Sequence, residues 1–135
     1  MNDASTSNRI VGPDGIAPPL GAYSHGIVAS GPGRWLHIAG QVGVAPDGTL
    51  APGFEAQARQ AWTNLAAVLR EAGMEARHLV RVGSFLVDPA HLPLLGPVRQ
   101  PFLGEARPAS TVLVVRALAR PGWLFEVEAT AFRQD

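Results

Sequence analysis

The sequence predicts a single α+β domain, and three observations carry that prediction. The chain has 135 residues, which is enough for one core and too few for two. Hydrophobic residues make up 47% of it and charged residues 16%, a balance typical of a packed globular protein. Apolar residues are spaced as in strands near both ends of the chain and as in a helix between them. We therefore take residues 1–135 as one domain, with residues 1–8 as a flexible tail.

The first half of the chain predicts a β-hairpin followed by a long helix. Residues 24–44 hold two β-prone runs, SHGIVAS and RWLHIAGQVGV, around a Gly-Pro-Gly break, a pattern that favours a hairpin. In residues 54–72 apolar side chains recur every three or four positions, which predicts an amphipathic helix with Trp62 and Leu65 on its buried face. Gly73 then stands where a left-handed residue closes a helix.

The second half predicts a strand, a second helix and two closing strands. Residues 78–88, HLVRVGSFLVD, alternate as a strand does, and Asp88-Pro89 is a helix-start signal. In residues 89–104 prolines recur every four positions, which predicts a short or kinked helix because each interior proline removes a hydrogen bond. The closing strands are predicted in residues 110–119 and 123–133.

The closing strands carry apolar residues on both of their faces. In the last strand Phe125, Val127, Ala129 and Ala131 share one face, while Leu124 and Phe132 share the other with acidic residues and threonine. Two helices can cover only one face of a sheet, and a face left in water normally shows a cleaner alternation. We therefore expect another subunit to cover the second face.

Composition excludes several classes of function. The net charge is zero and basic residues do not cluster, so a nucleic-acid partner is not expected. The chain has no lysine and no cysteine, which excludes Schiff-base chemistry, thiolate nucleophiles and cysteine-zinc sites. Its four histidines are widely separated, so no metal site is predicted. No segment resembles a signal peptide or a membrane span, and the expected location is cytoplasmic, without a membrane partner.

Several segments together resemble a known family across nearly the whole chain. They are GAYSHG (21–26), HIAGQVGVAPDG (37–48), AQARQAWTNLAAVLREAGM (56–74), VRVGSFLVD (80–88), RPASTVLVV (107–115) and FEVEATAF (125–132). Their order and spacing are similar to those of the RidA/YjgF/YER057c/UK114 family, also called endoribonuclease L-PSP. The resemblance implies a chorismate-mutase-like fold with a six-stranded mixed sheet and two helices packed on one face. It also implies a homotrimer without a cofactor, with small-molecule clefts between its subunits.

The resemblance also implies candidate catalytic residues. Well-understood members hydrolyse reactive enamines and imines, and they hold the substrate carboxylate with an arginine directly after a Pro-Ala pair. Here Pro108-Ala109 is followed by Ser110, so the chain resembles a branch that lacks this arginine. Glu126 matches the family's glutamate near the catalytic water, and Glu126 and Ser110 are therefore the candidates. The alternative for Glu126 is a strand carboxylate on a solvated face.

Five further residues are candidates for substrate binding: Tyr23, Gly40, Gln41, Arg107 and Thr111. Tyr23 matches a loop tyrosine that closes over the ligand, although an aromatic side chain can also simply pin its loop. Gly40 and Gln41 match residues that line the cleft, and the Thr111 hydroxyl can donate a hydrogen bond. Arg107 can partly replace the missing arginine or point to solvent from a turn, and both interpretations stay open.

These residues predict an imine deaminase, a hydrolase that acts on a small imine-like metabolite by water attack without a covalent intermediate. Because Ser110 carries no charge, the sequence predicts weak activity on imines that bear a carboxylate. A non-catalytic small-molecule-binding or regulatory trimer of the same fold is the alternative, so whether the chain is an enzyme stays open. Endoribonuclease activity is disfavoured by the zero net charge and the absence of lysine.

Overall fold

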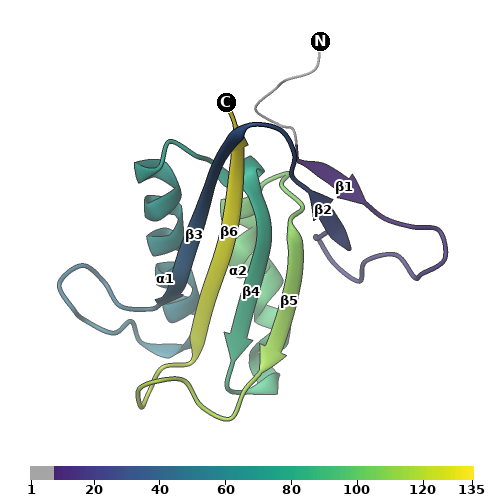
Figure 1. Cartoon of the computed structure of the whole chain (residues 1–135). Coiled ribbons are helices and arrows are strands. Elements are labelled where there is room, and N and C mark those ends of the chain that lie inside the picture. Colours follow the sequence, from purple (N-terminus) through teal and green to yellow (C-terminus); the bar gives the residue numbers. More distant parts are fainter. Residues whose placement is uncertain (1–7) are drawn as a thin grey trace.

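The computed structural model describes residues 8–135 and confirms an α+β fold with a mixed sheet and two α-helices (Figure 1). Two short 3-10 turns are η2 (Ala76–His78) and η3 (Pro89–His91). The helices are α1 (Gly53–Glu71) and α2 (Leu92–Leu103). The strands are β1 (Arg9–Val11), β2 (Gly26–Val28), β3 (Gly33–Val42), β4 (Leu79–Leu86), β5 (Ala109–Val114) and β6 (Phe125–Gln134).

Helix α1 forms where the apolar spacing predicts it and packs on the sheet. Trp62 and Leu65 are each only 1% exposed, which confirms the predicted core face. Gly73 follows the helix with a φ of 72°, a conformation that glycine adopts without the steric cost of a Cβ. The turn that it makes lets the Met74 N–H donate to the Leu69 carbonyl at 2.9 Å, so the helix end is closed by backbone hydrogen bonding.

Helix α2 runs for twelve residues despite its three prolines. The Asp88 side chain accepts a hydrogen bond from the Ala90 N–H at 2.9 Å, as expected at a helix start. Pro93 lies in the first turn, where its missing N–H has no helical partner to lose. Pro97 and Pro101 lie inside the helix, and each leaves one carbonyl without its helical hydrogen bond. The helix continues past them because its buried side chains pack against α1 and the sheet.

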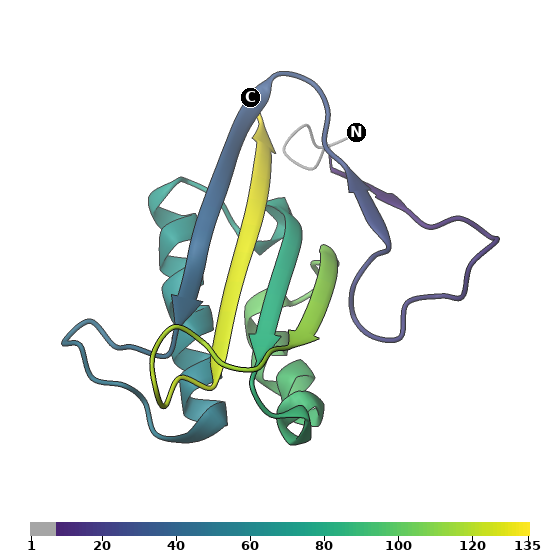
Figure 2. The same cartoon turned by 60° about the horizontal axis from the view of Figure 1, so that its bottom comes forward.

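The main sheet has the strand order β3-β6-β4-β5. Strand β6 is antiparallel to both of its neighbours, and β5 is parallel to β4. Both helices lie behind this sheet in Figure 1, and the second view shows them on that same face (Figure 2). The side chains of β6 that face the helices are at most 4% exposed, as the alternation predicts: Phe125, Val127, Ala129 and Ala131.

The predicted hairpin of residues 24–44 is wrong. Strand β2 pairs with β1, with Ile27 opposite Ile10, and the two form a separate small sheet beside the main one (Figure 1). The six strands are thus divided between a sheet of four and a sheet of two, instead of forming one six-stranded sheet. Gly31 has a φ of 87° and Pro32 has no N–H for a ladder, so the chain leaves β2 before β3 begins.

The chain is anchored at Asn8, the last residue of the tail that the sequence predicts to be flexible. The Asn8 side-chain amide donates to the carbonyls of His78 and Phe132, both at 3.2 Å. These bonds fix the start of β1 to the ends of η2 and β6. The rest of the predicted tail, residues 1–7, lies outside the described residues.

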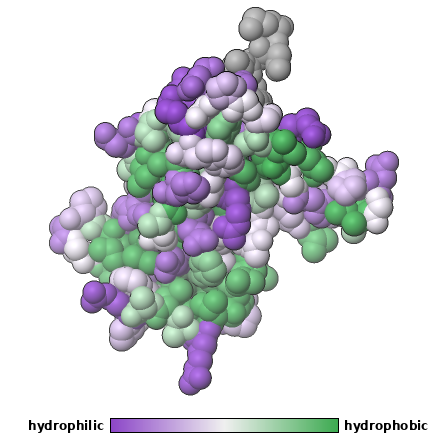
Figure 3. Space-filling view, in the orientation of Figure 1, coloured by the Kyte–Doolittle hydropathy of each residue, from purple (hydrophilic) through white to green (hydrophobic). Residues whose placement is uncertain are grey.

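The second face of the main sheet is covered by neither helix. Trp35 is 52% exposed there and Leu113 48% exposed, while Arg81 and Glu128 form an ion pair with an N to O distance of 3.2 Å. Apolar and polar residues are intermixed in the view that looks onto this face (Figure 3). An exposed tryptophan and leucine beside charged groups are unusual on a water-facing sheet and typical of a surface that meets a partner.

Candidate active site

Glu126 lies on the uncovered face of the sheet, directly over Gly40. Its neighbours across the sheet are Val42 of β3 and Phe85 of β4. A Cβ atom built on Gly40 would lie 1.8 Å from Oε2 of Glu126 and 2.7 Å from its carboxyl carbon. Only glycine at position 40 therefore leaves the carboxylate in its place.

A β-bulge produces this close approach. The pairing of β3 with β6 shifts register between Ile38 and Gln41, which takes Ala39 and Gly40 out of the regular ladder. The Gln41 side-chain amide donates to the Ala39 carbonyl at 3.0 Å and braces the bulge. Such irregularities re-aim side chains and backbone groups at functional sites. We call Gly40, Gln41 and Glu126 the bulge cluster, and it unites three of the predicted site residues.

The loop that carries Tyr23 lies along the edge strand β5. Ser24 forms a parallel bridge with Ala109, and its N–H donates to the Pro108 carbonyl at 3.0 Å. The Ser24 hydroxyl donates to the carbonyl of Arg107. These bonds place Tyr23 one residue away from the contact with β5, beside the start of the strand that carries Ser110.

Tyr23 is held by its own loop. Its hydroxyl accepts a hydrogen bond from the Leu20 N–H at 3.2 Å, and its ring meets His25 edge to face at 6.3 Å between centroids. His25 in turn contacts the Ala17 carbonyl through Nε2 at 2.6 Å. The loop is therefore organised around the tyrosine rather than hanging free.

A residue that the sequence analysis missed, Arg99 of α2, reaches the position of the missing arginine. Its Nη1 donates to the Ser110 hydroxyl oxygen at 3.3 Å. Burial lowers the pKa of Arg99 from its usual value, and the neighbouring Tyr23 phenol acts in the opposite direction. The guanidinium therefore lies beside Ser110, and Arg99 lines one hollow together with Gly21 and Ala22 of the loop that carries Tyr23. We call Tyr23, Arg99 and Ser110 the edge cluster.

A sequence signal for Arg99 did exist. Arg99 lies four residues after Leu95 and four before Leu103, so it occupies the apolar stripe of α2. It is only 9% exposed. A cation in the buried stripe of a helix is uncommon and therefore indicates a specific partner.

Arg107 points away from the edge cluster. Its Nη1 donates to the carbonyls of Gly104 and Ala106 at 2.9 and 2.8 Å, which it binds at the end of α2. A basic side chain at this place stabilises the exposed carbonyls of a helix terminus. The sequence left open whether Arg107 replaces the missing arginine or points to solvent, and the structure shows a third arrangement, in which the guanidinium binds backbone oxygens of its own turn.

Ser110 and Glu126 lie on opposite faces of the sheet. Strand β4 lies between the strands that carry them. Ser110 pairs with Val82 of β4, and Glu126 pairs with Phe85 of β4. Val82 is 1% exposed and faces the helices, and Phe85, an odd number of residues away, faces the other side. Thr111, next to Ser110, also points to the uncovered face and is exposed. Within one chain the two predicted catalytic residues therefore do not meet.

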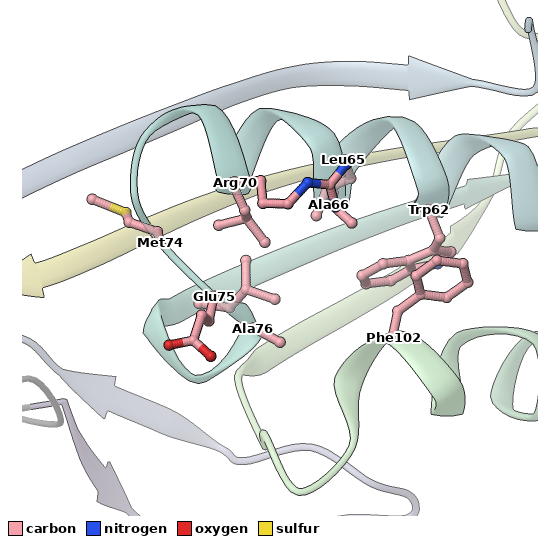
Figure 4. A pocket seen from close by; sticks show the side chains of 10 residues that line it. Trp62, Leu65, Ala66, Arg70, Met74, Glu75, Ala76 and Phe102 are labelled. Atoms are coloured by element: carbon pink, nitrogen blue, oxygen red, sulfur yellow. The ribbon is translucent and has the colours of Figure 1, made fainter.

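A separate apolar pocket lies between α1 and η2 (Figure 4). Trp62 and Phe102 stack at one end of it, with ring centroids 6.0 Å apart, and Arg70 and Glu75 lie among the residues that line it. Apart from these two exposed side chains the lining is hydrophobic. The pocket lacks the convergent polar groups that a hydrolytic site requires, and none of the predicted site residues lines it.

Two further findings concern residues 8–135. No helix in this range is both long and apolar enough to cross a membrane. Within the same residues no three His, Asp or Glu side chains gather closely enough to hold a metal ion.

Comparison with known proteins identifies close similarities over most of the chain. The family model described as endoribonuclease L-PSP matches residues 15–133. A RutC family protein of Pyrococcus horikoshii is 32% identical over 118 residues, which cover 86% of this chain and 90% of that protein. A 2-iminobutanoate/2-iminopropanoate deaminase of Capra hircus is 29% identical over 130 residues, covering 95% and 92% of the two chains.

A solved structure supports the same assignment. The crystal structure of a Rid family protein of unknown function from Yersinia pestis has a TM-score of 0.83 and 35% identity, and the match covers 93% of this chain and 98% of that one. The fold, the family model and the related sequences agree over almost the full length. The chain therefore belongs to the RidA/YjgF family, whose sequence model is described as endoribonuclease L-PSP.

Proposed function

We propose that this protein hydrolyses a small imine or enamine in a cleft between two subunits. The observation that carries the proposal is the Glu126 carboxylate, which the bulge seats over Gly40 on the uncovered face of the sheet. A carboxylate on a rigid strand can accept a proton from water and direct the oxygen at an electrophilic carbon. The goat relative carries the name of an imine deaminase, which supports the same chemistry.

The reaction needs no cofactor in this scheme. Glu126 accepts a proton from water while the water oxygen bonds to the carbon of the C=N group, and it then returns this proton to the nitrogen, which leaves the carboxylate ready for the next cycle. The C–N bond of the tetrahedral carbinolamine then breaks as its hydroxyl proton passes to the nitrogen, which releases ammonia and leaves the carbonyl product. Tyr23 covers the ligand and the Ser110 hydroxyl donates a hydrogen bond to it, whereas Thr111 points to the other face of the sheet and takes no part beside Ser110.

A second subunit is required because the bulge cluster and the edge cluster lie on opposite faces of one sheet. A trimer whose uncovered faces turn inward would bring the bulge cluster of one subunit toward the β5 edge of the next. The exposed Trp35 and Leu113 support such an interface, since association would remove their apolar surface from water.

Two alternatives make different predictions. A non-catalytic binding or regulatory trimer would keep the cleft but would not accelerate hydrolysis. An endoribonuclease would need a basic surface for the phosphate backbone, and this chain has zero net charge.

The test measures the hydrolysis of imines generated in situ. A dehydratase supplies 2-iminobutanoate, and an amine oxidase supplies an imine without a carboxylate. We expect faster ketone formation with the protein present, and a loss of about 10²- to 10⁴-fold in Glu126→Gln, the range for a positioned general base. A protein that gains thermal stability from the ketone product but accelerates neither reaction would be a binder, and the catalytic proposal would be rejected.

A further inference from the structure

Arg99 is a buried cation without a negatively charged partner. It is only 9% exposed, and its hydrogen bond to protein is the one from Nη1 to the Ser110 hydroxyl oxygen. Among residues 8–135 no carboxylate lies within ion-pair distance of its guanidinium. A guanidinium has five N–H donors and stays protonated, so most of its hydrogen-bonding capacity is free for another acceptor.

Such an arrangement is unfavourable unless an anion completes it. Moving a charge out of water is costly, and proteins normally offset the cost with a counter-ion. Other arginines of this chain illustrate the contrast, because Arg81 has Glu128 at 3.2 Å and Arg77 has Glu75 at 3.2 Å. The more deeply buried Arg99 has none. The missing partner is therefore expected to come from outside the chain.

The surroundings of Arg99 leave space for a small molecule. A surface hollow of about 360 Å³ borders it, and glycines lie on two of its sides, Gly21 in the Tyr23 loop and Gly96 in α2. A Cβ on Gly96 would meet no atom within 4 Å, so this side is open. A Cβ on Gly21 would lie 3.8 Å from the Tyr23 ring, so the tyrosine ring is next to this lining residue. The hollow is within the size range of small-ligand sites.

We propose that Arg99 binds the carboxylate of the ligand and so takes over from α2 the role of the arginine that is absent at position 110. This inference rests on the proposed function and specifies its substrate class as imines that carry a carboxylate, the 2-imino acids. The planar guanidinium offers two parallel N–H groups to the two carboxylate oxygens, while Ser110 orients it through the bond to Nη1. The expectation of weak activity on such imines, drawn from Ser110 alone, is thereby reversed.

The test is an equilibrium binding measurement, so that it does not depend on turnover. The probes are 2-oxobutyrate, the stable ketone that corresponds to 2-iminobutanoate, and 2-butanone, which lacks the carboxylate. Affinities are measured by calorimetry or ligand-observed NMR. We expect Arg99→Gln to weaken the affinity for 2-oxobutyrate by about 10- to 100-fold, which is the usual contribution of a hydrogen bond to a charged group. The affinity for 2-butanone should not change.

Matched variants make the result specific. Arg59→Gln removes an exposed arginine of α1 and should change neither affinity. Arg99→Lys keeps the charge but not the planar pair of donors. Its affinity for 2-oxobutyrate should therefore lie between those of wild type and Arg99→Gln. Adding Ser110→Arg to Arg99→Gln should restore much of the affinity for 2-oxobutyrate, because it returns a cation to the same place from the neighbouring strand.

Three results of the binding measurement would overturn the inference: a wild type that does not bind 2-oxobutyrate, an Arg99→Gln variant that binds it as tightly as wild type, or an Arg99→Gln variant whose affinity falls equally for 2-oxobutyrate and 2-butanone. An effect of Arg99→Gln on subunit association without an effect on 2-oxobutyrate would show that a partner's carboxylate is the counter-ion, and would overturn it as well. If carboxylate binding depends on Arg99 but no imine is hydrolysed, the inference stands and the proposed function fails. If imines are hydrolysed independently of Arg99, the reverse holds.

Discussion

The replacement of Gly40 by alanine is the sharpest available test of the role proposed for Glu126. The added Cβ would lie 1.8 Å from Oε2 of Glu126, and such contacts below 3.0 Å are essentially never found. The carboxylate must therefore retreat by more than ~1 Å, a displacement that can cost a catalytic group about 100-fold in rate. We expect kcat/KM for imine hydrolysis to fall by about that factor in Gly40→Ala.

The assay compares initial rates of ketone formation at equal protein concentration. Gly12→Ala is the matched control, because a Cβ there meets nothing within 4 Å. Circular dichroism and light scattering establish that fold and oligomeric state are retained. A Gly40→Ala variant that keeps both and also keeps wild-type kcat/KM would refute the argument, since the carboxylate would then not need its present position.

A double variant shows whether the alanine acts through Glu126. If the damage comes only from displacing that carboxylate, Gly40→Ala should cost nothing further in a Glu126→Ala background, where there is no carboxylate to displace. Multiplicative losses in the double variant would mean that Gly40 contributes on its own, for example through its backbone.

The remaining predictions concern the stability of the fold and the assembly. Trp62→Ala should lower the free energy of unfolding by about 3 to 5 kcal/mol in a denaturant titration at fixed protein concentration, because Trp62 is 1% exposed. Trp62→Phe should lower the free energy of unfolding by only about 1 kcal/mol or less, because it keeps an aromatic ring and removes an indole N–H that has no hydrogen-bond partner. A loss as large as that of Trp62→Ala would contradict this prediction. Asn64→Ala should lower the free energy of unfolding by about 1 to 3 kcal/mol, because the Asn64 amide donates to the carbonyls of Val42 and Val44 at 3.1 and 3.0 Å. An unchanged free energy of unfolding would mean that water satisfies these carbonyls in the variant. Light scattering should find a trimer at micromolar concentration, and a stable monomer would remove the basis for a site between subunits.

Much of the fold could be predicted because the relevant signals are local. The three- and four-residue spacing in residues 54–72 defines α1 within a residue or so, and Gly73 closes it as predicted. The alternation in β6 correctly separates its buried face from its acidic face. Periodicity reports directly on which side of an element is buried, and these elements are long enough for the pattern to be unambiguous.

Strand pairing was harder to predict because it depends on the path of the chain. The Gly-Pro-Gly break at residues 31–33 looks like a hairpin turn, yet β2 pairs with β1, some fifteen residues earlier in the chain. A three-residue strand carries too little pattern to specify its partner. The same holds for the bulge in β3, where nothing in the local sequence shows that Glu126 would lie over Gly40.

The candidate site was predicted in part. The bulge cluster came entirely from residues that the family resemblance indicates, and the structure brings those residues together. Arg99 was missed because Arg107 is the cation nearest to position 110 along the sequence. In space the nearer cation belongs to α2, eleven residues before Ser110, and Arg107 binds the end of that helix. Proximity along the chain is a poor guide when a helix packs beside the strand that follows it.

Subunit complementation tests the central claim most directly, namely that one site combines Arg99 and Ser110 of one subunit with Glu126 of another. Arg99→Gln and Glu126→Gln chains are each expected to be nearly inactive on 2-iminobutanoate. When equal amounts are co-assembled, each mixed trimer contains one interface with both wild-type residues, so about a quarter of wild-type activity should return. Mixed trimers, verified by native mass spectrometry, that show no recovery above the separate variants would contradict the account.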